Sequence, residues 1–309
     1  MSAATGDARL GRVRATAYPK LTLSLRVLGL RPDGFHELEG FVVSLGQPQD
    51  VVEAYAVPAP GGVQMEMIRD DFGDRIPGDE IPSDHRNLAF IAAEKLMVRA
   101  GRSGHGVRLV LRKHIPTGAG LGGGSADAAA ALLAVRRLLD VDIDEAGLLQ
   151  VAAETGSDVP FCVRGGAAWM RGRGELLEPV NLPGRIGFLL AIPPFRLMTP
   201  EVYRKWDELG GPVAERVIPT KGRLAEIVPE LGNDLEPAAE AVEPRMKEFR
   251  FALEQAAGRP ALMAGSGSAY VVPVPDARKL PALVEQVGRR LRVPVVGTTN
   301  VSRGVRLSA

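Results

Sequence analysis

The stretch PTGAGLGGGSADAAAALLA, residues 116–134, places five glycines ahead of a run of alanine and leucine. Glycine disfavours a helix and the run after it favours one, so we expect a loop that ends at a helix N-terminus. Main-chain N–H groups without side chains around them approach an anion closely, and the helix dipole favours negative charge there. Ser125 and Asp127 follow as typical helix-start residues. The segment predicts a phosphate-binding loop, with a flexible hinge as the alternative.

Two other nucleotide-binding loops share this glycine pattern. A Walker loop ends in Gly-Lys-Ser or Gly-Lys-Thr, and no lysine follows these glycines. The dinucleotide fingerprint matches at Gly118, Gly120 and Gly123, with Asp140 near the spacing of a ribose-binding acid. However, the expected strand before the loop carries two arginines, and a second helical pattern follows where that fold needs a strand. A dehydrogenase that binds NAD is therefore the weaker interpretation.

The apolar pattern predicts the elements that position this loop. A period of two indicates strands, and helical spacing with caps indicates helices. In residues 20–29 the leucines and Val27 alternate with polar residues, which predicts a strand with one buried face. Strands and helices follow each other with mixed connectivity, so we expect an α+β protein. The expected strands are 20–29, 41–46, 49–57, 62–69, 106–116, several within 158–180, 186–194, 261–275 and 293–302. The expected helices are about 87–101, one from 125, 142–156, 199–209, 233–258 and 276–291.

Composition excludes several classes of function. The 309 residues are 45% hydrophobic with a formal net charge of +1, which gives no reason to expect a nucleic-acid or anionic-membrane surface. The single cysteine excludes an internal disulfide, and the histidines show no zinc-ligand spacing. The first residues lack a secretory pattern, and the most apolar run is too short to span a bilayer. We expect a cytoplasmic protein without a structural metal. The histidines and cysteine are His36, His85, His105, His114 and Cys162.

The glycine loop resembles the central motif of the galactose, homoserine, mevalonate and phosphomevalonate kinase superfamily. Residues 17–40, AYPKLTLSLRVLGLRPDGFHELEG, resemble the N-terminal motif of one branch, the 4-diphosphocytidyl-2-C-methyl-D-erythritol kinases of the non-mevalonate isoprenoid pathway. The run RPDGFHEL distinguishes that branch. GSDVPF, GNDLEPAA and MAGSGSAYVV, which begin at residues 156, 232 and 263, are similar to further motifs of these enzymes. The resemblance therefore extends in order from about residue 15 to 275.

This resemblance implies a two-domain small-molecule kinase. The N-terminal nucleotide-binding domain, 1–180, would be ribosomal-protein-S5-domain-2-like, and the C-terminal domain, 181–309, ferredoxin-like, with the active site in the interdomain cleft. The implied reaction is phosphoryl transfer from ATP, with Mg²⁺, to the 2-hydroxyl of 4-diphosphocytidyl-2-C-methyl-D-erythritol. The implied partner is that small molecule, without nucleic acid or membrane. The chain would be a monomer or homodimer.

The resemblance also assigns the catalytic and nucleotide-binding roles. Lys20 and Asp158 match the catalytic couple, in which the carboxylate orients the hydroxyl proton and the ammonium offsets charge on the phosphoryl oxygens. For Asn87 a contact with the nucleotide and a helix cap are both open. Gly265–Ser268 would form a second glycine turn on the same cleft. The residues expected to bind ATP are Pro116, Thr117, Gly118, Ala119, Gly120, Leu121, Gly122, Gly123, Gly124, Ser125, Ala126 and Asn87.

Three residues match the cytosine-binding part of the motif. Phe35 would stack on the base, His36 would bond its edge, and Tyr203 would be the opposing aromatic. The chain departs from the usual pattern with Thr22 in place of asparagine and Phe35 in place of tyrosine. Phe35 keeps stacking but lacks a hydroxyl. Two alternatives stay open: another kinase of the superfamily, and a nucleotide-binding protein that does not catalyse.

Overall fold

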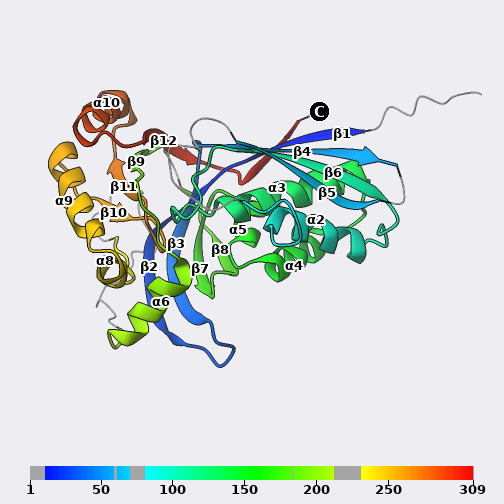
Figure 1. Cartoon of the computed structure of the whole chain (residues 1–309), viewed down its shortest axis with the longest axis horizontal. Helices are drawn as coiled ribbons and strands as arrows, with labels where there is room; N and C mark the ends of the chain where they lie inside the picture. Colours follow the sequence, from blue (N-terminus) through cyan, green and yellow to red (C-terminus); the bar gives the residue numbers. More distant parts are fainter. Residues whose placement is uncertain (1–10, 59–60, 70–80, 183, 212–230, 309) are drawn as a thin grey trace, which may run out of the picture.

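The computed structural model describes residues 11–58, 61–69, 81–182, 184–211 and 231–308. Two sheets carry the helices of the chain (Figure 1). In the described residues no helix is long and apolar enough to cross a membrane. The predicted α+β class is confirmed.

The first sheet has five strands in the order β13-β1-β4-β6-β5. Only the β5–β6 pair is parallel among these pairs, and the others are antiparallel. Its strand β13 comes from the C-terminal end of the described chain and pairs with β1 near the start. The five strands are β1 (Arg12–Ala17), β4 (Asp50–Val57), β5 (Gly62–Arg69), β6 (Gly106–Lys113) and β13 (Val305–Ser308).

Four helices gather on one face of this sheet (Figure 1). The alanines 128–131 are fully buried in α3, and small side chains let that helix approach β1, β4 and α2 closely. Arg108 is exposed on the opposite face of β6, so none of the described helices covers it, as the arginines of this strand had indicated. The helices are α2 (Leu88–Arg99), α3 (Gly123–Leu138), α4 (Glu145–Thr155) and α5 (Val159–Arg164).

The second sheet extends through both halves of the chain. Its strand order is β10-β11-β9-β12-β3-β7-β8, and β2 pairs with β3. β12 joins the halves because its residues 295–299 pair with β9 while Asn300 and Val301 pair with β3. The eight strands are β2 (Lys20–Leu30), β3 (His36–Leu45), β7 (Ala167–Gly172), β8 (Leu176–Pro179), β9 (Gly187–Ala191), β10 (Leu262–Met263), β11 (Tyr270–Val274) and β12 (Val295–Val301).

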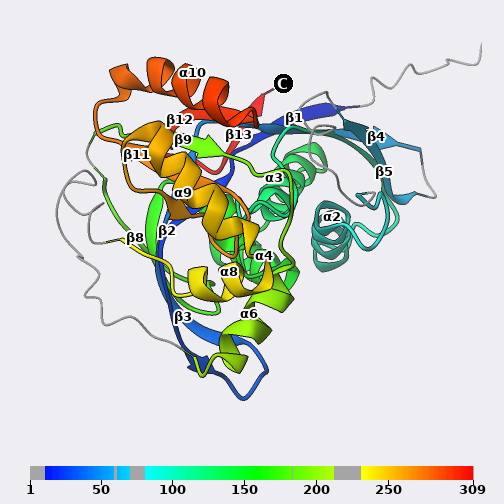
Figure 2. The same cartoon turned by 60° about the vertical axis from the view of Figure 1, so that its left-hand side comes forward.

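The C-terminal helices surround the far part of this sheet. Figure 2 shows α9 and α10 over the strands of that part, and α6 beside the β2–β3 hairpin. Residues 233–258 were expected to be helical with proline interruptions, and the structure has such a break at Pro244, between α8 and α9. The helices are α6 (Thr199–Glu208), α8 (Glu236–Val242), α9 (Arg245–Ala257) and α10 (Leu280–Leu291), with the short 3₁₀ helix η2 (Ala277–Lys279) before α10.

The structure corrects three expectations. Residues 159–164 form α5 rather than a strand, with a proline in the first turn. β1 and β13 were not expected, although residues 13, 15 and 17 of β1 alternate as buried apolar positions. β2 does not have a single buried face, because Lys20, Thr22 and Ser24 are buried too. The expected division near residue 180 stays a prediction.

Candidate active site

A cavity of about 710 Å³ opens where the glycine loop, the β2–β3 hairpin and α6 meet. Its walls come from both sides of residue 180, so the two halves of the chain build it together. Lys20 and Thr22, two of the buried polar residues of β2, line this cavity. The predicted site residues that line the cavity are Lys20, Phe35, His36, Pro116–Gly124, Asp158 and Tyr203.

The glycine loop requires glycine at two positions for different reasons. Gly120 has φ of 75°, and a Cβ there would lie 1.8 Å from the Ala264 carbonyl oxygen. Gly122 has φ of 65°, and its Cβ would lie 2.7 Å from Cγ of Lys20. Positive φ disfavours a side chain at both positions, and at Gly120 the contact is with backbone that cannot move aside. The loop has a defined backbone conformation with close contacts, which argues against a flexible hinge.

The loop ends at the N-terminus of α3. Gly122 is the N-cap residue and supplies no side-chain bond, and the N–H of Ala126 makes the first helical bond, to the Gly122 carbonyl. The three preceding N–H groups therefore have no partner within the helix. They sit at the positive end of the helix dipole, where an anion is favoured. Ser125 is the third helical residue rather than the cap, and neither it nor Ala126 lines the cavity.

A second glycine turn, residues 265–268, lies directly against the loop. The N–H of Ser268 donates to the Gly118 carbonyl at 3.2 Å, and the N–H of Ala269 donates to the Ala119 carbonyl at 3.3 Å. Residues 265–267 line the same cavity, as expected for them. The two loops thus support each other through main-chain bonds.

Lys20 and Asp158 face each other across 3.4 Å, from Nζ to Oδ2. Lys20 begins β2, and its main-chain N–H donates to the Leu121 carbonyl at 3.0 Å, which joins the strand to the glycine loop. Its Nζ also donates to the Thr22 hydroxyl at 3.1 Å. Asp158 precedes α5 and makes no capping bond, so its carboxylate stays available to Lys20. The Lys20 side chain is 9% exposed and that of Asp158 35%, so the carboxylate is the member open to a ligand.

An aromatic group lies at another part of the cavity. The rings of His36 and Tyr203 are 4.8 Å apart at 32°, and Trp206 meets His36 edge-on at 5.6 Å. Nε2 of His36 is 2.9 Å from Oδ1 of Asp207. Burial, together with the nearby charge of Asp158, raises the pKa of Tyr203, so its hydroxyl stays protonated. The neutral, flat ring of Tyr203 therefore lies beside the His36 ring, whose orientation is set by its bond to Asp207.

Phe35 has a cationic neighbour in the cavity. Phe35 as a residue is 47% exposed, and the Arg173 guanidinium lies 4.9 Å from the centre of its ring. Tyr203 stacks on His36. The proposed sandwich of Phe35 and Tyr203 around a base stays a prediction, and both residues line the cavity. Arg173 was missed from sequence, because its position in the turn between β7 and β8 gives no local sign of a ligand.

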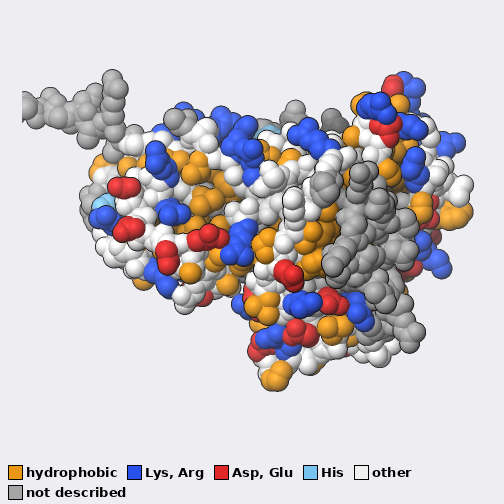
Figure 3. Space-filling model, turned by 180° about the vertical axis from the view of Figure 1, so that it is seen from behind, with side chains coloured by type: hydrophobic (Ala, Val, Ile, Leu, Met, Phe, Trp, Pro, Cys, Tyr) orange, Lys and Arg blue, Asp and Glu red, His pale blue; other side chains and the backbone are white. Residues whose placement is uncertain are grey.

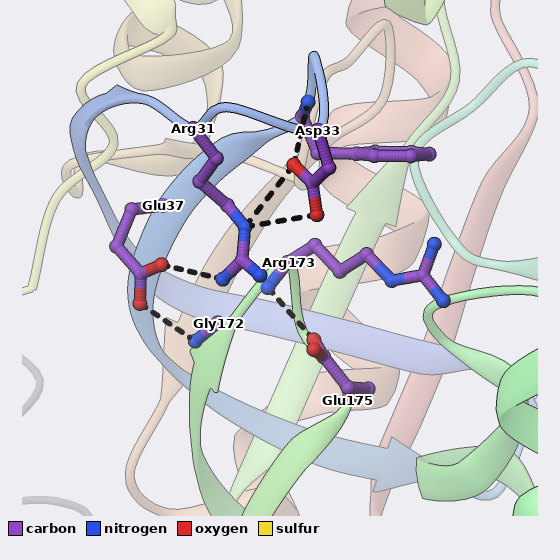
Figure 4. Close-up of polar contacts among 7 residues, drawn as sticks. Arg31, Asp33, Glu37, Gly172, Arg173 and Glu175 are labelled. Atoms are coloured by element: carbon purple, nitrogen blue, oxygen red, sulfur yellow. Dashed lines mark hydrogen bonds and ion pairs between the residues drawn. The ribbon is translucent and has the colours of Figure 1, made fainter.

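The hairpin turn that carries Phe35 is tied to the β7–β8 turn (Figure 4). Arg31 donates through Nη1 to Glu37 at 2.6 Å, and the second Glu37 oxygen accepts the Gly172 N–H at 3.1 Å. Asp33 accepts from Nε of Arg31 and from the Phe35 N–H. These bonds hold the turn against the strand that leads to Arg173. They give Arg31, Asp33 and Glu37 a structural role in this turn.

Asn87 has a structural role in α2. Its Oδ1 accepts the N–H of Ala89 at 2.9 Å and its Nδ2 donates to the Pro82 carbonyl at 2.8 Å. Asn87 does not line the cavity. The helix-cap alternative is therefore confirmed, and a contact with the nucleotide stays a prediction.

A buried ionic cluster lies beneath the glycine loop. Lys113 forms ion pairs with Asp50 and with Asp127, the latter at 2.6 Å, and Asp50 also accepts the Ile115 N–H at 2.8 Å. Burial, joined by the charge of Asp50, raises the pKa of Asp127 well above its ordinary value. Asp127 was expected to start the helix, but the structure places it inside the cluster. Its signal in the sequence was a lysine three residues before Pro116 and an aspartate just after the glycines.

Comparison with known proteins agrees with this geometry. The GHMP kinases N terminal domain matches residues 87–166. A 4-diphosphocytidyl-2-C-methyl-D-erythritol kinase of Pelotomaculum thermopropionicum is 40% identical over 82% of this chain and 86% of that protein. The kinase of the same name from Cutibacterium acnes is 35% identical over 94% of both chains.

Solved structures share the fold. A crystal structure of 4-(cytidine 5'-diphospho)-2C-methyl-D-erythritol kinase has a TM-score of 0.74 and 32% identity, covering 93% of this chain and 98% of that one. A homoserine kinase from Cytophaga hutchinsonii has a TM-score of 0.68 at 18% identity, covering 96% and 97%, which shows the fold alone. The expected superfamily fold is confirmed. The chain belongs to the family of 4-diphosphocytidyl-2-C-methyl-D-erythritol kinases.

Proposed function

We propose that this protein transfers the γ-phosphoryl group of ATP to the 2-hydroxyl of 4-diphosphocytidyl-2-C-methyl-D-erythritol. The observation that carries the proposal is the placement of the Lys20–Asp158 pair, 3.4 Å apart, in the same cavity as the glycine loop. A kinase of this kind needs a phosphate-binding loop and an acid–base couple within reach of one acceptor oxygen.

The glycine loop would hold the β- and γ-phosphates of ATP. Support comes from the unpartnered N–H groups at the start of α3 and from the side-chain-free approach at Gly120 and Gly122. The division of the chain near residue 180 fits a cleft that both halves line.

Mg²⁺ would enter with ATP. Among the described residues no group of three or more His, Cys, Asp or Glu side chains could hold a metal ion. Magnesium in such sites commonly keeps waters and takes one or two protein ligands together with substrate phosphates, so the cavity fits an ion that the phosphates carry. The ion would offset negative charge on the phosphoryl oxygens.

The reaction balances with the residues in the cavity. The acceptor oxygen forms a bond to the γ-phosphorus as the bond from that phosphorus to the β–γ bridging oxygen breaks, and ADP leaves. The hydroxyl proton passes to the carboxylate of Asp158. Lys20 keeps that carboxylate oriented and offsets charge on the transferred group. Because the transition state is loose, the proton leaves late, and orientation contributes more than basicity.

The aromatic group would recognise the cytosine. Flat faces at Phe35 and Tyr203 and the polar edge of His36 line the cavity together. Base–aromatic stacking contributes roughly 1–3 kcal/mol per base in single-strand binding sites, enough to select a cytidyl substrate over a small alcohol. The hydrogen bond that Asp207 accepts from Nε2 fixes the orientation of the His36 ring.

A coupled assay of ADP release tests this function. The purified protein is given ATP, Mg²⁺ and one acceptor: the cytidyl substrate, homoserine or mevalonate. We expect turnover only with the cytidyl substrate and competition by CMP. Turnover with homoserine or mevalonate would assign another kinase activity. ATP binding without turnover on any acceptor would favour the non-catalytic alternative.

A further inference from the structure

A second cavity of about 590 Å³ lies away from the candidate active site. It opens among the β1–β2 junction, the glycines after α5, the end of β8 and the turn between β12 and β13. No residue lines both cavities. Its volume falls in the usual range of small-molecule pockets.

The lining of this second cavity contains basic side chains and no acidic ones. Arg185, Arg303 and Arg306 line it, and no aspartate or glutamate does. Within the part of the chain that the structure describes, none of the three arginines forms an ion pair or a side-chain hydrogen bond. Arginines elsewhere on the surface, such as Arg245 and Arg278, do pair with neighbouring carboxylates. Acidic and basic side chains also share the face seen in Figure 3. Three unpaired guanidinium groups around one hollow favour an anion there.

The walls of the cavity are built from bonded main chain. Gly165 has φ of 71°, and a Cβ on it would lie 1.8 Å from the main-chain nitrogen of Gly304. The N–H of Tyr18 donates to the Gly304 carbonyl at 3.0 Å, and the Asn300 side chain accepts the Ile186 N–H at 2.9 Å. The hollow is therefore pre-formed, which lowers the ordering cost of binding.

We propose that this arginine cavity binds a phosphate-bearing small molecule at a second anion site. Guanidinium groups recognise phosphate through paired N–H donors, and a free phosphate or a phosphorylated metabolite offers the same oxygens. Two residues of the lining are close along the chain to the catalytic pair. Tyr18 lies two residues before Lys20, and Gly165 follows α5, which begins directly after Asp158. A ligand in the arginine cavity contacts the chain segments that lead to both members of the pair.

Amide NMR of the full chain titrated with inorganic pyrophosphate tests the proposal. The N–H signals of Gly165, Gly166 and Gly304 report on the arginine cavity, and those of Gly120 and Gly122 report on the active site. We expect both sets to shift in the wild type. In the double variant Arg303→Ser/Arg306→Ser, we expect the first set to shift with at least about tenfold weaker affinity and the second set to be unchanged.

Two further variants keep the test sharp. Arg137→Ser/Arg259→Ser removes two exposed arginines that line neither cavity, so it controls for lost charge and should leave both sets unchanged. Arg185→Ser alters the opposite wall and leaves β12 and β13 intact, so it should weaken binding even if the double variant folds poorly. Absence of shifts at the first set in the wild type would overturn the proposal, as would equal affinity in Arg185→Ser and the charge control.

Discussion

Gly122→Ala should separate the position of Lys20 from the stability of the fold. Gly122 has φ of 65°, a left-handed conformation that costs an alanine about 1–2 kcal/mol. The new Cβ would also lie 2.7 Å from Cγ and 3.0 Å from Cε of Lys20. The methylenes of Lys20 are flexible, so the lysine side chain moves rather than the backbone. Reaching ordinary carbon–carbon contact requires a shift of about 1 Å.

That shift displaces Nζ from Asp158, which it faces at 3.4 Å. A misplacement of about 1 Å at a catalytic group commonly costs ~10²-fold in rate. We therefore expect kcat to fall by ~10²-fold, about 2.7 kcal/mol in the barrier. The free energy of unfolding should fall only by the left-handed cost. ADP release at saturating ATP and acceptor measures the first quantity, and denaturant unfolding measures the second.

Gly101→Ala is the matched control. Gly101 also has φ of 65°, but a Cβ there meets nothing within 4 Å, and the residue does not line the cavity. It should lose the same stability as Gly122→Ala and keep its kcat. If the two variants had kcat values within about twofold of each other, the position of Lys20 would not limit phosphoryl transfer, and the reasoning would be refuted.

Three further predictions concern other groups. Asp158→Asn keeps the side-chain size but removes the proton acceptor, so kcat should fall by ~10²–10⁴-fold with the KM for ATP nearly unchanged; a normal kcat with only KM altered would contradict the role of Asp158. Asp207→Asn weakens the hydrogen bond to His36, whose Nε2 lies 2.9 Å from Oδ1 of Asp207. The KM for the acceptor should therefore rise ~tenfold, with kcat and the KM for ATP unchanged. An equal rise in the KM for ATP would mean a general disturbance of the cavity. Burial, joined by the charge of Glu240, raises the pKa of Glu236 to about 7 from 4.5, so the folded protein keeps a proton that the unfolded chain has lost. The free energy of unfolding of the wild type, relative to that of Glu236→Gln, should therefore fall by roughly 1–3 kcal/mol between about pH 4.5 and pH 7. Denaturant unfolding on both sides of that window measures this difference. A difference independent of pH would show that Glu236 does not titrate there.

Much of the local structure followed from residue order. The change from glycines to alanines predicted where α3 begins, because helix propensity acts between near neighbours. Asn87 was readable as a cap for the same reason, and the alternation in residues 20–29 predicted β2. Residues 159–164 were misassigned to a strand because the six residues of this helix, VPFCVR, are mostly apolar, as in a buried strand.

What tertiary structure alone decided concerns partners that are distant along the chain. The 3.4 Å separation of Lys20 and Asp158, which only the resemblance had paired, the stacking of Tyr203 on His36 and the burial of Asp127 against Lys113 all depend on how sheets and helices pack. β2 was predicted to have one buried face, and only the fold shows that Lys20 and Thr22 are buried too and line a cavity. Propensity and periodicity record the preferences of neighbouring residues, so they predict elements. The contacts between elements arise from side-chain packing in three dimensions, which no local pattern encodes.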